Sequence, residues 1–82
     1  MSVIREVVEV LARALADRPD DVRVVESQHK GTTLVELYVA PGELGRVIGK
    51  QGRTAAALRT LASTAGEKIG KTVTLEIRDG KP

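Results

Sequence analysis

The first apolar positions of the chain recur at the spacing of a helix. Five residues share one stripe, at positions i, i+3, i+4, i+7 and i+11: Ile4, Val7, Val8, Leu11 and Leu15. Such a stripe is typical of an amphipathic helix with one buried face. Ser2 is a suitable N-cap, and Arg18-Pro19-Asp20 is a strong stop signal. We therefore predict a helix over residues 2–17.

Three later segments alternate between apolar and polar residues, which is the period of a strand with one buried face. The first strand covers residues 22–28 and ends at a hairpin turn, His29-Lys30-Gly31. The second strand ends before Pro41-Gly42, and its inner face consists of Val35, Leu37 and Val39. The inner face of the last strand consists of Val73, Leu75 and Ile77.

Two helices separate the second and third strands. The first is short and runs into Gly49; its apolar residues are Leu44, Val47 and Ile48. The other starts near Gly52 and ends at Gly66, a suitable C-cap; its apolar face consists of Ala55, Leu58, Ala62 and Ala65. Because each strand is apolar on one side only, the order α-β-β-α-α-β predicts an α+β fold. We expect a three-stranded sheet with helices on one face and water on the other.

Composition narrows the class of protein. Residues 1–82 form one domain, because 82 residues are too few for two hydrophobic cores. The absence of cysteine excludes disulfides, zinc–thiolate sites and thiol chemistry. The single histidine, His29, falls in the hairpin turn, so we expect no enzyme, no metal site and no cofactor. Charged residues interrupt the first apolar stripe, so we expect no membrane insertion and a cytoplasmic protein.

The outer face of the predicted sheet offers little chemistry. Glu36 and Glu76 fall on different strands, so solvated surface charge is a simpler interpretation than a catalytic carboxylate pair. Tyr38 on the same face suits either stacking on a base or an ordinary half-exposed strand position.

A basic segment of the chain also holds a cluster of glycines. Residues 1–29 carry four basic and six acidic residues, whereas residues 44–71 carry six basic residues and one acidic residue. Within the basic segment, Gly49-Lys50-Gln51-Gly52 places two polar residues at the tip of a tight turn between helices. Glycines let a ligand approach the backbone, and helix N-terminal amides together with Lys50 and Arg53 favour an anion.

Two common phosphate-binding motifs do not fit this turn. The phosphate loop of nucleotide hydrolases needs a glycine where Leu44 stands and a serine or threonine where Gln51 stands. The dinucleotide fingerprint G-x-G-x-x-G is absent. The simpler alternative to an anion site is a turn that only joins two helix caps. In that case the basic residues around it form an ordinary solvated surface.

The turn and its context resemble the KH domain of RNA-binding proteins. The likeness is most specific over Gly45–Arg59, where Val-Ile-Gly-Lys-Gln-Gly-Arg lies between two helices. The element order is similar to the type II KH fold, which implies a mixed sheet with the last strand beside the second and parallel to it. The resemblance also implies a G-x-x-G loop at residues 49–52 that clamps about four nucleotides of single-stranded RNA. The RNA-binding residues would be Arg46, Val47, Ile48, Gly49, Lys50, Gln51, Gly52 and Arg53.

The resemblance carries expectations about partners and role as well. Small stand-alone bacterial KH proteins self-associate and pair with a larger KH protein of the Jag (KhpB) type. They are linked to RNA chaperoning, post-transcriptional regulation, cell-wall biogenesis and cell shape. The main alternative is a protein-interaction module with a KH fold and little or no RNA binding. Lys50-Gln51 between intact glycines favours retained nucleic-acid binding, although no residue distinguishes RNA from single-stranded DNA.

The helix that starts near Gly52 has more apolar surface than one buried stripe requires. Ala57 and Leu61 lie at an i, i+4 offset beside the predicted core face. A surplus apolar stripe on a small domain is often buried against another chain. We therefore predict a dimer interface that includes both residues; the alternative is that Leu61 packs on the neighbouring helix.

Overall fold

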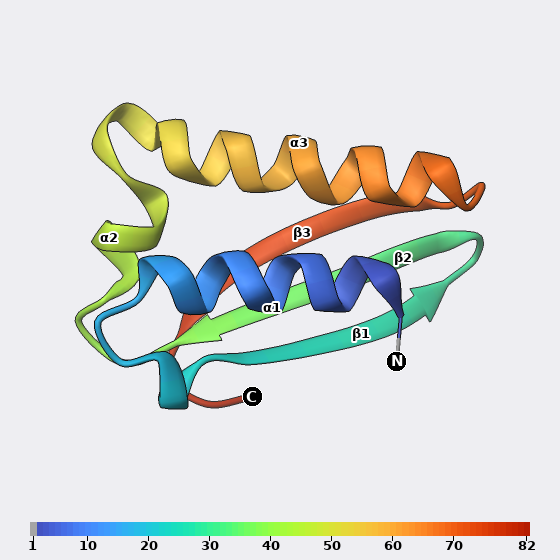
Figure 1. The fold of residues 1–82 in the computed structure, drawn as a ribbon. Coiled ribbons are helices and arrows are strands. Elements are labelled where there is room, and N and C mark those ends of the chain that lie inside the picture. Colours follow the sequence, from blue (N-terminus) through green and yellow to red (C-terminus); the bar gives the residue numbers. More distant parts are fainter. Residues whose placement is uncertain (1) are drawn as a thin grey trace.

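The helices and strands follow each other in the order predicted from the sequence (Figure 1). The computed structural model describes residues 2–82. Their elements are α1 (Val3–Leu15), the 3₁₀ helix η1 (Pro19–Asp21), β1 (Arg23–His29), β2 (Thr32–Val39), α2 (Leu44–Ile48), the 3₁₀ helix η2 (Lys50–Gly52), α3 (Arg53–Lys68) and β3 (Thr72–Asp79). α1 and α3 lie side by side on one face of the sheet, and α2 with its following turn lies at one end of that layer. The α+β class is confirmed.

α1 begins beside the predicted N-cap and ends earlier than predicted. Oγ of Ser2 accepts a hydrogen bond from the Arg5 amide at 3.0 Å. The helix stops at Leu15, and Ala16 is extended, so the predicted end at residue 17 is wrong. Leu15 is 40% exposed. The buried face of the helix consists of Ile4, Val8 and Ala12.

β2 is the central strand of a mixed sheet. β1 pairs with β2 in antiparallel fashion and β3 pairs with it in parallel, which confirms the arrangement that the resemblance implied. The β1–β2 connection is a two-residue turn, Lys30 and Gly31, with φ angles of 47° and 85°. Positive φ at both positions is the mark of a type I′ hairpin turn. His29, predicted in the turn, instead ends β1 and pairs with Thr32.

The hydrophobic core lies between the sheet and the layer of helices. The alternation predicted for β2 is complete, because Val35, Leu37 and Val39 are buried and the residues between them are half-buried. The largest fully buried side chains are Ile4, Leu37, Val8, Val22, Val35, Val39, Val47 and Thr33. In β3, Leu75 is buried while Val73 and Ile77 lie at the margin of the core.

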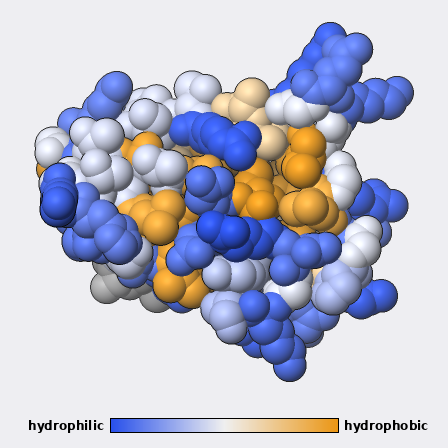
Figure 2. All heavy atoms as spheres, turned by 180° about the vertical axis from the view of Figure 1, so that it is seen from behind, coloured by the Kyte–Doolittle hydropathy of each residue, from blue (hydrophilic) through white to orange (hydrophobic). Residues whose placement is uncertain are grey.

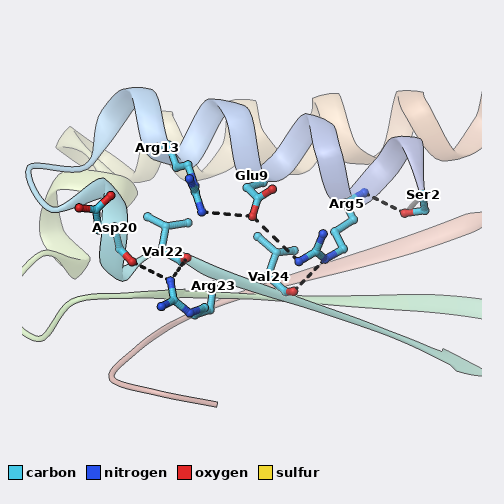
Figure 3. Close-up of polar contacts among 8 residues, drawn as sticks. All are labelled: Ser2, Arg5, Glu9, Arg13, Asp20, Val22, Arg23 and Val24. Carbon is cyan, nitrogen blue, oxygen red and sulfur yellow. Dashed lines mark hydrogen bonds and ion pairs between the residues drawn. The ribbon is translucent and has the colours of Figure 1, made fainter.

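Arginines from the helices contact both outer strands of the sheet. Nε of Arg5 in α1 donates to the carbonyl oxygen of Val24 in β1 at 3.1 Å, and Glu9 lies 4.0 Å from the same guanidinium (Figure 3). On the other side, Nε of Arg59 in α3 donates to the carbonyl oxygen of Leu75 in β3 at 3.3 Å. These contacts fasten each long helix to the strand beneath it.

Gly66 has a different role from the one predicted. α3 continues through Gly66 to Lys68 and ends at Ile69, so the prediction that Gly66 caps the helix is wrong. Gly66 is buried where α3 meets β3. A Cβ there would lie 2.4 Å from Cγ2 of Val73 and 2.8 Å from the carbonyl oxygen of Lys71. The missing side chain therefore lets the helix and the strand approach closely.

Candidate nucleic-acid interface

The turn between α2 and α3 has a backbone that few residues adopt. Gly49, which ends α2, has φ 77° and ψ 175°, a region that is essentially restricted to glycine. Gln51 and Gly52 follow in the left-handed region, with φ angles of 56° and 71°. Lys50 and Gln51 are exposed at the tip, as the sequence predicted.

The two glycines of the turn serve different purposes. A Cβ at Gly49 would lie 2.4 Å from Oγ1 and 2.8 Å from Cβ of Thr54, in the first turn of α3. A Cβ at Gly52 would meet no atom within 4 Å. Gly49 thus allows the end of α2 to close against α3, whereas Gly52 supplies only a left-handed backbone angle.

Some of the amide donors in this turn are used internally. The Gly49 amide donates to a carbonyl of α2 at 2.9 Å, and the Gly52 amide donates to the Gly49 carbonyl at 3.2 Å. The Arg53 amide donates to the carbonyl of Lys50. Within residues 2–82, the amides of Lys50 and Gln51 have no acceptor. The donors available to a ligand therefore lie at the tip itself, rather than at Gly52 or Arg53.

The cationic side chains around the turn differ in their availability. Lys50 and Arg53 are exposed, and neither forms an ion pair with any residue in the described part of the chain. Arg46, in α2, is paired: its Nε lies 2.7 Å from Oδ2 of Asp17. The predicted basic cluster therefore contains one arginine with an intramolecular counter-ion, which the sequence did not reveal.

The two apolar residues before the turn lie at different depths. Val47 is fully buried in the core, so it supports α2 from below and presents no surface to a ligand. Ile48 is half-buried and remains accessible beside the turn. Seen from behind, hydrophobic surface extends toward the end of the molecule that carries α2, where hydrophilic side chains project into solvent (Figure 2).

Glu43 anchors the helix that leads into the turn. Its side chain is nearly inaccessible, with 6% of the residue exposed. Oε1 accepts hydrogen bonds from the amides of Asp17 and Arg18, just after α1, the latter at 3.0 Å. Oε2 is buried, and no partner for it exists among the residues described. Sequence reasoning missed this contact, because the two segments lie 25 residues apart and Glu43 follows no periodic pattern.

Known proteins share both the sequence and the fold of this chain. The sequence model described as "KhpA/KhpB, KH domain" matches residues 5–77. The chain belongs to the KhpA/KhpB family of KH domains. It is 53% identical over 77 residues to the "RNA-binding protein KhpA" of Aquifex aeolicus, covering 94% of this chain and 98% of that protein. It is 45% identical over 74 residues to the protein of the same name from Clostridium perfringens, with coverages of 90% and 99%.

Solved structures agree with the KhpA/KhpB assignment at the level of the fold. The structure of Aquifex aeolicus Era bound to GDP·AlF4⁻ matches with a TM-score of 0.66 and 19% identity, over 98% of this chain and 31% of that one. Era in complex with MgGDPNP and a segment of 16S ribosomal RNA matches with a TM-score of 0.63 and 19% identity, over 93% of this chain and 29% of that one. Together with the family match, these similarities confirm the type II KH fold.

The surplus apolar stripe of this KhpA/KhpB-family domain is exposed. Leu61 is 46% exposed, so its proximity to α1 does not bury it, and Ala57 is exposed as well. Leu61 lines three adjoining shallow hollows between α1 and α3. We use the name α1/α3 apolar face for the exposed apolar residues of this region: Val3, Val10, Leu15, Ala57, Leu61 and Ile69.

The open face of the sheet is polar and centred on Glu36. Oε2 of Glu36 accepts a hydrogen bond from the Tyr38 hydroxyl at 3.1 Å and lies 3.2 Å from Nε of Arg78. Desolvation by neighbouring side chains and the hydrogen bond to Glu36 raise the pKa of Tyr38 above its ordinary value. Across residues 2–82, no cluster of acidic and histidine side chains has the arrangement of a metal site. Over the same span, no helix has the length and apolar character needed to cross a membrane.

Proposed function

We propose that this chain is a non-enzymatic protein that binds single-stranded RNA through the G-x-x-G loop at residues 49–52. The observation that carries the proposal is the exposed Lys50–Gln51 tip, framed by two glycines with positive φ, in a chain of the KhpA/KhpB family. The relatives with 53% and 45% identity are named RNA-binding proteins. Residues 1–82 then act as one KH domain in the cytoplasm.

The loop suits the backbone of a single strand. The amides of Lys50 and Gln51 offer donors to a phosphate, and the side chains of Lys50 and Arg53 add positive charge. Ile48 gives an apolar surface beside the loop on which a base rests. A duplex hides its bases, whereas a single strand presents them to such a surface. Because these contacts are few, one domain alone is expected to bind weakly.

The affinity for single-stranded RNA is expected to fall steeply with salt. Two or three phosphate contacts predict a slope of log K against log salt of about −1.4 to −2, since each contact with a single strand contributes about 0.7. Fluorescence anisotropy of a labelled RNA, measured at several salt concentrations, gives this slope. Single-stranded DNA and duplex RNA of the same sequence serve as comparators. A flat salt response contradicts the phosphate contacts, and no binding at low salt favours a protein-interaction module instead.

We also propose that the α1/α3 apolar face joins two copies of this chain. Its hollows are lined mostly by apolar side chains, and a small domain rarely leaves such a contiguous surface uncovered. Two joined copies gain RNA affinity through effective concentration. Because one sequence model describes the KH domains of both KhpA and KhpB, a heteromer with a Jag (KhpB)-type protein would use the same face.

Leu61→Arg is expected to yield a folded monomer. The arginine places a charge in the middle of the α1/α3 apolar face, and Leu61 is exposed enough for the fold to accept it. Light scattering at several protein concentrations measures the oligomeric state, and circular dichroism measures the fold. The matched control is Ser63→Arg, an exposed position of α3 that lines none of the hollows. A Leu61→Arg variant that self-associates like the control shows that the interface lies elsewhere.

The proposed cellular role is that of an RNA chaperone or post-transcriptional regulator linked to cell-wall biogenesis and cell shape. Its support is the family resemblance. Crosslinking in cells followed by sequencing of the bound RNA identifies the client transcripts. A variant of the loop tip serves as the control in the same cells.

A further inference from the structure

Asp17 lies outside the G-x-x-G loop, yet its carboxylate faces an arginine next to that loop. Nε of Arg46 lies 2.7 Å from Oδ2 of Asp17, and their side chains are 64% and 61% exposed. The pair is therefore accessible to solvent and to any ligand at the turn. Exposed ion pairs are weak, so an incoming anion can exchange with the carboxylate.

The position of Asp17 is fixed by the helix that leads into the loop. Oε1 of Glu43 accepts hydrogen bonds from the amides of Asp17 and Arg18, and Glu43 itself is buried. The carbonyl of Glu43 accepts a hydrogen bond from the Arg46 amide at 3.0 Å. One buried residue thus holds the backbone of both partners of the exposed ion pair. The fold thus brings the Asp17 carboxylate within reach of Arg46.

We infer that Asp17 is an affinity-determining residue that competes with RNA phosphate for Arg46. The inference rests on the proposed RNA binding at residues 49–52 and concerns how strongly that site holds its ligand. A phosphate that contacts Nε of Arg46 displaces Asp17, and a phosphate on the other guanidinium nitrogens lies close to a carboxylate of like charge. While the ion pair between Arg46 and Asp17 is intact, it has no net charge, so Arg46 does not neutralise a phosphate of the RNA. Asp17 thereby lowers the electrostatic part of the affinity.

Asp17→Asn is expected to raise the affinity for single-stranded RNA about two- to fivefold at low salt, the range that an exposed ion pair is worth. The released Arg46 adds one phosphate contact, so the slope of log K against log salt steepens by up to about 0.7. The melting temperature is expected to stay unchanged, because Glu43 binds the backbone amide at this position rather than the side chain. Asp17→Ala makes the same change of charge and keeps the same amide.

The matched control is Asp20→Asn, which removes the same charge from an exposed position of η1 that forms no ion pair within residues 2–82. A double-mutant cycle with Arg46→Gln isolates the coupling. In the Arg46→Gln background, Asp17→Asn is expected to gain no more affinity than Asp20→Asn. The inference is overturned if Asp17→Asn and Asp20→Asn raise the RNA affinity of the wild-type chain equally. It is also overturned if Asp17→Asn raises the affinity of the Arg46→Gln variant as much as that of the wild-type chain. Absence of RNA binding by the wild-type chain overturns the proposed function as well, whereas wild-type binding without the Asp17→Asn gain overturns this inference alone.

Discussion

A double variant at the tip of the turn, Lys50→Asp with Gln51→Asp, is expected to lose RNA affinity by about 100-fold or more at low salt. The change removes an exposed cation of the proposed site and places two carboxylates where we propose that a phosphate binds. These carboxylates also compete with the phosphate for the free amides of the tip. The comparison requires the affinity and the melting temperature to be measured on the same preparation.

The fold is expected to survive this change. Both tip side chains are exposed and neither belongs to the hydrophobic core, so the free energy of unfolding should change by no more than about 0.5–1 kcal/mol. A matched control is Lys71→Asp with Thr72→Asp, which makes the same change of charge beyond the far end of α3. Unchanged RNA affinity in a folded tip variant would falsify the assignment of the loop as the binding site.

Gly49→Ala and Gly52→Asn are expected to differ sharply in stability. At Gly49, alanine meets both a backbone region restricted to glycine and a Cβ contact of 2.4 Å to Thr54. Strained backbone and overpacking together predict a loss of about 2–4 kcal/mol, which lowers the melting temperature of a domain this small by about 10–20 °C.

Gly52 is expected to accept asparagine with a loss of no more than about 0.5–1 kcal/mol. Its φ of 71° and ψ of 15° suit a left-handed asparagine, and the space around it is open. Thermal melts monitored by circular dichroism compare the two variants with wild type. Equal losses at the two positions would mean that contact with Thr54 plays no part in fixing the turn. RNA binding by Gly52→Asn then reports on the loop without a confounding change of fold.

Much of the fold could be predicted from periodicity. Strand alternation identified the buried faces of β2 and β3, because residues two apart share a face whatever else surrounds them. The glycine pair located the turn, since the end of α2 needs an angle that only glycine adopts. The type II KH topology came from the family resemblance, and pairing between strands distant in sequence has no local signal.

Contacts between distant segments could not be predicted. The sequence predicts Gly66 as a helix C-cap because glycine commonly has that role. Its close approach to Val73 depends on how α3 crosses β3, which the sequence does not show. Val47 fits the apolar surface of a binding groove from its sequence position, yet the packing of α2 buries it completely. The pairing of Arg46 with Asp17 joins segments whose proximity is created by the fold alone.

The two arginines that contact the outer strands also affect how this chain can assemble. Arg5 covers a carbonyl of β1 and Arg59 covers a carbonyl of β3, so both margins of the sheet carry a bulky cation on a backbone acceptor. An extended peptide, or the margin of another sheet, needs those acceptors to add a strand. The two arginines therefore oppose the addition of a strand from another molecule at both margins. They also oppose the aggregation that such addition would cause. The association that we propose through the α1/α3 apolar face needs neither margin of the sheet.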